Sequence, residues 1–160
     1  MKKKVKVILA ALLLMSMFTA TMAQAADAST GTETVPRMYI DGVLLESDVP
    51  PIVLGEDDFY VMVPLRAITE ALGYTIEWGG FSQIRIEGNG NGHSTVTIGN
   101  QEFWATNRAS MVVNAPFIAR NRTMVCIWTI RSVFADSVDD VSFDFEQNVL
   151  MITTTLPAQN

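Results

Sequence analysis

The chain has 160 residues, a formal net charge of −6, one histidine and one cysteine. All four lysines lie in the first six residues, so the rest carries seven arginines against seventeen acidic side chains, a charge of −10. Nucleic acids and anionic lipids bind clustered basic residues, so this balance argues against both as partners. One cysteine cannot form an internal disulfide, and the fold must depend on its hydrophobic core.

The N-terminus has the pattern of a secretory signal peptide. The lysines precede an apolar run over residues 7–15, and Ala23 and Ala25 frame a cleavage site. This run is shorter than the ~20 residues that a membrane span needs, and Cys126 lies too far along the chain for a lipoprotein anchor. We therefore expect a signal peptide over residues 1–25 and a secreted or cell-surface protein without membrane contact after cleavage.

Residues 26–36 are small, polar and end in proline, and we expect a disordered leader there. Short alternating runs begin near Arg37. Two pairs of these runs flank turn dipeptides: residues 38–40 and 43–45 around Asp41-Gly42, and residues 95–98 and 101–104 around Gly99-Asn100. Asp-Gly and Gly-Asn tolerate the positive φ of tight turns, so both pairs are predicted to be β-hairpins.

Two stretches, residues 64–73 and 127–134, have helical spacing. In the first, Pro64 is expected at the first helical position and Gly73 at the left-handed cap. The apolar faces of both stretches are the predicted core, and their members lie 62 positions apart: Leu65, Ile68 and Leu72 correspond to Ile127, Ile130 and Phe134.

The chain therefore contains a repeat. Each predicted helix follows a β-rich run, at 59–63 or 123–125, and precedes two strands, at 74–78 and 83–86 or at 141–145 and 149–152. The sequence predicts an α+β fold of small antiparallel sheets packed on two short helices, built from two divergent β-β-α-β-β repeats, at about 38–87 and 95–153. Residues 88–92 are expected to form a flexible glycine-rich connector. Neither half is large enough for a secure core, so we expect one domain over residues 37–155.

The segment Val61–Trp78 resembles the signature of the copper amine oxidase-like N-terminal domain, also called the stalk domain, and Ile40-Asp41-Gly42 and Ala115–Val125 resemble further elements of it. The resemblance implies a small antiparallel sheet wrapped on one or two helices, in exported or cell-surface proteins of Gram-positive, often anaerobic, bacteria. The second half departs from the pattern: Cys126 and Trp128 stand where proline and arginine belong, and Ala135 replaces the capping glycine. The loop over residues 136–140 is also longer than its counterpart.

The residues do not favour catalysis. Type 2 copper needs several imidazoles, whereas His93 is the only histidine and lies in a glycine-rich segment. No Gly-x-Ser-x-Gly elbow is present, and the pairs Asp57-Asp58 and Asp139-Asp140 are expected to be solvated acidic tips. Cys126 is expected to be a buried, inert thiol. We expect no enzyme activity, no metal and no cofactor.

Two tryptophans outside the predicted core register are the candidate ligand-binding residues. Trp128 stands in the position that the first half gives to Arg66, about 100° from the apolar helix face. Trp104 alternates with Phe103 on a predicted strand. Exposed tryptophan suits carbohydrate stacking or a protein hot spot, although packing between the two halves is the more frequent role.

The favoured interpretation is a non-catalytic, exported envelope module that mediates binding or spacing at the cell wall, with wall glycan or an envelope protein as partner. One alternative is a hydrolase, or hydrolase accessory, that acts on wall polymer and that would bring two carboxylates together in a cleft. Another is a secreted regulator or inhibitor of a partner protein.

Overall fold

The computed structural model describes residues 35–88, 93–105 and 108–155, which belong to one compact unit. The predicted signal peptide, residues 1–25, lies outside the described residues, as do residues 26–34 of the predicted leader. Within the described ranges, no helix has the length and apolar character needed to cross a membrane.

The unit consists mainly of short strands with two α-helices, which agrees with the predicted α+β class. The helices are α2 (Leu65–Ala71) and α3 (Ile127–Val133), and a 3-10 turn, η1, covers Asp58–Tyr60. The strands in chain order are β1 (Arg37–Ile40), β2 (Val43–Leu45), β3 (Ile52–Val53), β4 (Val61–Pro64), β5 (Thr75–Gly80), β6 (Gln83–Glu87), β7 (His93–Thr97), β8 (Glu102–Ala105), β9 (Arg108–Met111), β10 (Phe117–Ala119), β11 (Arg122–Cys126), β12 (Val138–Asp144) and β13 (Val149–Thr154).

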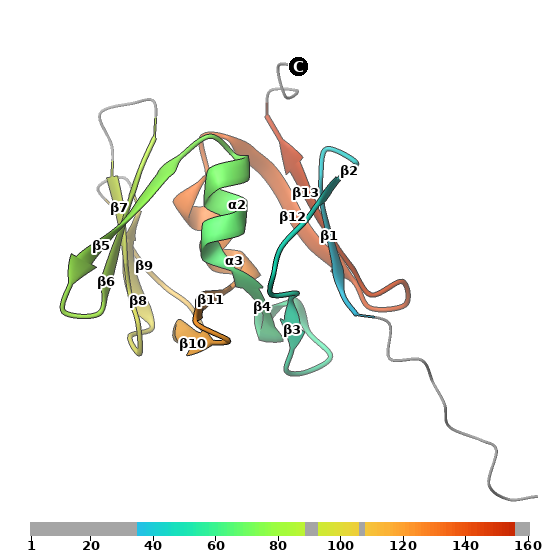
Figure 1. Cartoon of the computed structure of the whole chain (residues 1–160), viewed down its shortest axis with the longest axis horizontal. Helices are drawn as coiled ribbons and strands as arrows, with labels where there is room; N and C mark the ends of the chain where they lie inside the picture. Colours follow the sequence, from blue (N-terminus) through green and yellow to red (C-terminus); the bar gives the residue numbers. More distant parts are fainter. Residues whose placement is uncertain (1–34, 89–92, 106–107, 156–160) are drawn as a thin grey trace, which may run out of the picture. The chain divides into compact units, whose positions relative to one another are not determined.

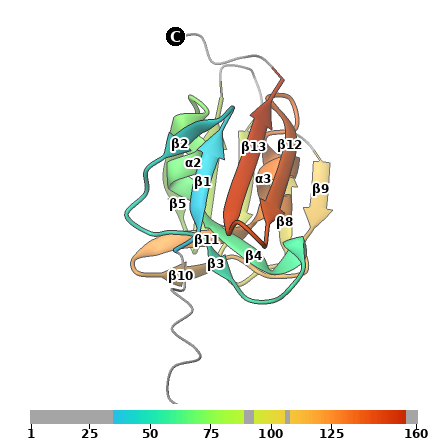
Figure 2. The same cartoon turned by 90° about the vertical axis from the view of Figure 1, so that its right-hand side faces the viewer.

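The described strands form three sheets around the helices (Figure 1). The five-stranded sheet has the order β5-β6-β7-β8-β9 and lies on one side of α2 and α3. The terminal sheet, β12-β13-β1-β2, lies on the other side, and Figure 2 shows its four strands in front of the helices. The central sheet, β10-β11-β4-β3, joins the two halves of the chain because β4 pairs with β11.

One strand pair corrects the expectation of purely antiparallel sheets. β1 pairs with β13 in parallel, with Met38 opposite Leu150 and Ile40 opposite Ile152. These strands come from opposite ends of the domain, so no hairpin turn sets their relative direction. The other strand pairs in the described sheets are antiparallel.

The two helices begin directly after central-sheet strands. Pro64 is the last residue of β4 and the N-cap of α2, with φ −70° and ψ 107°. It was predicted to be the first helical residue, but the helix begins one residue later, at Leu65. Gly73 has a φ of +80° and its N–H donates to the Glu70 carbonyl, so the predicted left-handed cap is confirmed. In the second half Phe134 is the C-cap of α3.

Two other local predictions are wrong. Phe59 and Tyr60 were expected in a strand but belong to η1, because the Tyr60 N–H turns back to the Asp57 carbonyl at 2.8 Å. Val138, Asp139 and Asp140, predicted in a loop, instead begin β12, which reaches its regular pairing through a shift in register before Asp140. The bulge leaves one residue, Asp139, outside the pairing and lets the strand continue.

The core lies between the two outer sheets and includes the predicted helix faces. Leu65, Ile68, Ile127, Ile130 and Phe134 are buried, and Leu72 packs against this cluster while remaining partly exposed. The five-stranded sheet adds an alternating set of buried residues, Ile84, Ile86, Val96 and Phe103.

Candidate functional site

A groove of about 370 Å³ opens between α2, the edge strand β5 and the β10–β11 hairpin. We call it the Trp78 groove. Its lining residues come from both halves of the chain: Arg66, Ile76, Glu77, Trp78, Ile84, Ile118, Asn121, Arg122 and Thr123.

Trp78 forms an apolar wall of this groove because of its place in the five-stranded sheet. It lies opposite Ile84, and Ile76 lies opposite Ile86, so by strand alternation all four side chains share the inner face. Ile84 and Ile86 are buried, whereas Trp78 is 60% exposed. The difference arises because β5 is the edge strand and its pairing becomes irregular between Trp78 and Gly80.

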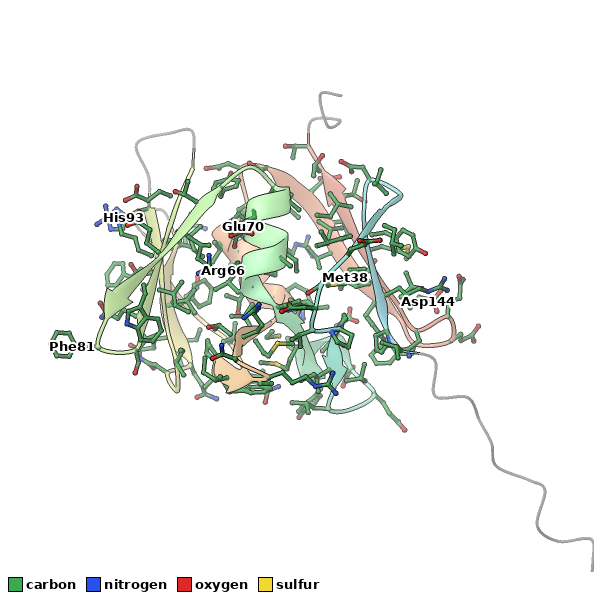
Figure 3. All side chains as sticks on the ribbon, viewed as in Figure 1. Met38, Arg66, Glu70, Phe81, His93 and Asp144 are labelled. Carbon is green, nitrogen blue, oxygen red and sulfur yellow. The ribbon has the colours of Figure 1, made fainter. Side chains whose placement is uncertain are left out.

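Arg66 supplies a cation on the helix side of the groove. It follows the buried Leu65 on α2, and its Nη1 donates to Glu70 Oε1 at 3.1 Å, one helical turn later (Figure 3). Both side chains are more than half exposed, at 54% and 56%. Such an exposed pair contributes only about 0.3–0.5 kcal/mol, so a ligand could redirect Arg66 at little cost.

The β10–β11 turn forms the opposite wall and is held firmly. Arg120 and Asn121 both have positive φ, 48° and 61°, which turns the chain sharply between the strands. Arg122 donates two hydrogen bonds to the Asp48 carboxylate, from Nε to Oδ1 at 3.2 Å and from Nη2 to Oδ2 at 2.5 Å. Its Nη1 donates to the Asn121 carbonyl. Next to this turn, Ile118 is 52% exposed and lines the groove.

Trp104, the first of the two predicted site residues, lies on a different surface. On β8 it pairs with Thr95 of β7 and Ala109 of β9, and it is 59% exposed. Its neighbour Phe103 is buried on the inner face, so the predicted alternation is confirmed. Trp104 therefore faces away from the helices, on the outer side of the five-stranded sheet.

Trp128, the second predicted site residue, is partly buried at the start of α3. Its ring stacks on Phe59, with centroids 5.3 Å and planes 19° apart. The Arg131 guanidinium lies 5.4 Å from the indole centroid, within range of a cation–π contact. Because Phe59 belongs to the first half of the chain, Trp128 packs between the two halves. This packing is one of the two roles expected for it from the sequence. The structure brings Trp104 and Trp128 to opposite faces of the five-stranded sheet.

Trp78 and Arg66 are not among the site residues that the sequence predicts. Trp78 fits the inward alternation of its strand, and Arg66 stands out in the sequence only as the counterpart of Trp128. A signal was present in Gly79 and Gly80, which directly follow Trp78 and mark the point where regular pairing ends.

The other reactive side chains do not join the groove. Cys126 is fully buried, its thiol donates to the Phe59 carbonyl at 3.3 Å, and burial raises the pKa of this thiol. Burial also raises the pKa of Asp58, with smaller contributions from the charges of Asp57 and Asp140. Asp139 and Asp140 were predicted to form a loop tip, but both lie on strand β12. Glu77 is the one carboxylate among the residues that line the Trp78 groove.

The donor residues do not fit a copper site. His93, the only histidine of the chain, is exposed on β7 and projects outward in Figure 3. Cys126 is enclosed at the junction of β11 and α3. In the part of the chain that the structure describes, no three histidine, cysteine or acidic side chains gather in a group that could hold a metal ion.

Comparison with known proteins identifies the domain. No curated protein matches the chain. A family model, the copper amine oxidase N-terminal domain, matches residues 39–144, which is more than half of the chain and includes the helices, the central sheet and the Trp78 groove. The chain belongs to the copper amine oxidase N-terminal domain family.

Proposed function

We propose that this chain is an exported, non-catalytic module that binds glycan at the cell wall or cell surface through the Trp78 groove. Its family is a non-catalytic domain. Export is supported by the N-terminal arrangement of lysines, an apolar run and the small residues Ala23 and Ala25. Intact mass of the mature protein tests this step, with Ala26 expected at the N-terminus.

The observation that carries the proposal is the exposure of Trp78 at the wall of a groove rich in hydrogen-bonding groups. The indole is 60% exposed, although it shares the inner face of its sheet with buried isoleucines. Arg66, Asn121 and Thr123 line the same groove. An exposed indole offers an apolar face to a sugar ring, while polar groups around it bind the ring's hydroxyls and fix its orientation.

A second candidate surface is the outer face of the five-stranded sheet around Trp104, which suits an envelope protein better than a glycan. Met111 lies on this face and is 70% exposed, opposite Glu102 and diagonal to Trp104. Exposed tryptophan and methionine are enriched at protein–protein interfaces, and tryptophan is a frequent hot-spot residue. The Trp78 groove remains the favoured site because it is concave and combines apolar and polar walls.

The hydrolase alternative is less well supported by the groove. A glycosidase needs two carboxylates facing one another across the substrate, and the residues lining the Trp78 groove include one, Glu77. The regulator alternative would use the Trp104 face, and binding to a partner enzyme would distinguish it from wall attachment.

We also propose that the domain arose from two divergent repeats. The order β4-α2-β5-β6 recurs as β11-α3-β12-β13. In the central sheet Val63 pairs with Val125, its counterpart 62 positions later, so the antiparallel pair is centred on equivalent residues. The final hairpin of each half then joins the sheet that contains the first hairpin of the other half. The parallel β1–β13 pair has no equivalent between β6 and β7.

A wall-pelleting assay tests the proposed function. The exported protein, without its signal peptide, is mixed with purified cell walls and sedimented, beside Trp78→Ala and Trp104→Ala as matched variants of two equally exposed tryptophans. We expect the wild type and Trp104→Ala to sediment with the walls and Trp78→Ala to stay in solution. If Trp104→Ala alone lost wall binding, the binding site would be the outer face of the five-stranded sheet and not the Trp78 groove. A wild type that does not sediment would refute wall binding.

A further inference from the structure

The Trp78 groove contains arginine side chains although the protein around it is acidic. Without the signal peptide the chain carries −10 in formal charge, yet two arginines and one acidic residue line the groove: Arg66, Arg122 and Glu77. Both arginines have an ion-pair partner, Glu70 for Arg66 and Asp48 for Arg122, so the groove has no net excess of positive charge. An anionic group would therefore bind to those guanidinium nitrogens that have no partner, and not to a general positive field.

The two lining arginines differ in what they offer to a ligand. All three nitrogens of the Arg122 guanidinium already donate, to Asp48 and to the Asn121 carbonyl. Arg66 makes one hydrogen bond, from Nη1 to Glu70, so its Nε and Nη2 have no partner among the described residues. These two nitrogens form the fork that binds the oxygens of a carboxylate.

Trp78 determines what kind of carboxylate fits. It lines the same groove as Arg66, with Ile118 on the hairpin side, so a bound anion would lie beside an apolar wall. A sugar ring can stack on the indole while a carboxylate attached to that ring reaches the arginine. The groove volume of about 370 Å³ lies at the lower end of the usual range for small-molecule sites, which suits a short stretch of glycan.

We infer that the Trp78 groove selects an acidic sugar, with the carboxylate of a hexuronate-like residue on Arg66 and its ring on Trp78. This inference rests on the proposed function of the groove as a glycan site. It adds that the charge of the glycan, and not only its ring, is recognised.

Calorimetric titration with a galacturonate trisaccharide and with its methyl ester tests the inference, because the ester keeps the rings and removes the charge. The acid should bind the exported protein about tenfold more tightly than the ester, as expected for one charge-assisted fork. Arg66→Gln should abolish this preference. Arg66→Lys, which keeps the charge but loses the fork, should restore only part of it. Arg37→Gln, on the terminal sheet, removes the same charge elsewhere and should change nothing.

The outcomes separate this inference from the proposed function. Equal binding of acid and ester, lost in Trp78→Ala, would overturn the inference and leave the groove as a neutral glycan site. Wall sedimentation that depends on Trp78 but not on Arg66 would do the same. If an oligomer of glycerol phosphate bound in an Arg66-dependent manner and the galacturonate did not, the anion would be a phosphate and the acidic-sugar assignment would be wrong. Absence of wall binding altogether would refute the proposed function itself.

Discussion

Phe59 and Trp128 stack across the two halves of the domain, with ring centroids 5.3 Å apart and an angle of 19° between their planes. Trp128 lies 62 positions after Arg66, and each is the second residue of its helix. The residue before each of them, Leu65 or Ile127, is buried. The same helical position thus packs against the other half in α3 and lines an open groove in α2. The departure of the second half from the family pattern at Trp128 therefore has a structural consequence. This position is covered by packing in α3, whereas in α2 it remains accessible in the groove.

The stacked pair predicts coupled stability. Trp128→Ala should destabilise the domain by roughly 2–4 kcal/mol, below the usual range for a fully buried tryptophan because Trp128 is partly exposed. Phe59 is more exposed than Trp128, so Phe59→Ala should lower the free energy of unfolding by less. A double-mutant cycle measured by urea unfolding should give a coupling energy of about 0.5–1.5 kcal/mol. Additive effects of the two changes would contradict the stack as a stabilising contact.

The central core predicts one cooperative transition. Ile68 and Ile130 are fully buried in one cluster, so truncation of either to alanine should cost roughly 2–5 kcal/mol. Because each half supplies the surface on which the other packs, both changes should lower a single transition followed by tryptophan fluorescence and by far-UV circular dichroism. Two transitions, each sensitive to one substitution, would mean that the halves unfold independently.

Tyr74 provides a second connection between the halves. Its hydroxyl shares a hydrogen bond with the Ser137 hydroxyl, and its ring meets Phe134 edge-on at 4.9 Å. Tyr74→Phe keeps the ring contact and removes the hydrogen bond, so it should cost about 0.5–1.5 kcal/mol. Ser137→Ala should cost a similar amount in thermal or urea unfolding. The double variant should be little worse than either single one, and fully additive losses would show that the bond is not formed in solution.

The raised pKa of Asp58 predicts a pH dependence of stability. Burial disfavours the ionised carboxyl, so the folded pKa lies above the unfolded value. The contribution of protonated Asp58 to stability is fully present below the ordinary aspartate pKa and is lost as pH rises through the raised folded value. Asp58→Asn should therefore gain stability relative to wild type as pH rises from below the ordinary aspartate pKa through the raised folded value. Urea midpoints across this range test the sign, and a constant difference would contradict it.

The helices and hairpins could be predicted because their signals are local. Gly73 has the positive φ that its cap position requires, and Asp41 and Gly42 have the positive φ of a tight turn. By contrast, the parallel pairing of β1 with β13 depends on contacts between the ends of the domain, for which no turn residue exists. The strands β3, β9 and β10 have two to four residues, too few to establish an alternating pattern.

The candidate site was less predictable than the fold. The alternation of β5 places Trp78 inward, and only the position of this strand at the sheet edge leaves the indole exposed. The groove also needs the β10–β11 hairpin, which follows β5 by about forty residues in sequence, so no local pattern reports their proximity. Trp104 could be assigned to the outer face because that assignment required only strand alternation next to Phe103.

The most direct test of glycan binding at the Trp78 groove uses the three tryptophans as separate reporters. Each indole N–H gives one cross-peak in a proton–nitrogen correlation spectrum, and single substitutions of Trp78, Trp104 and Trp128 assign them. On titration with solubilised cell-wall glycan, we expect a saturable shift of the Trp78 signal, while the Trp104 and Trp128 signals keep their positions. A spectrum in which the Trp78 signal stays fixed while wall fragments bind, or in which the Trp104 signal alone moves, would contradict the assignment of the site.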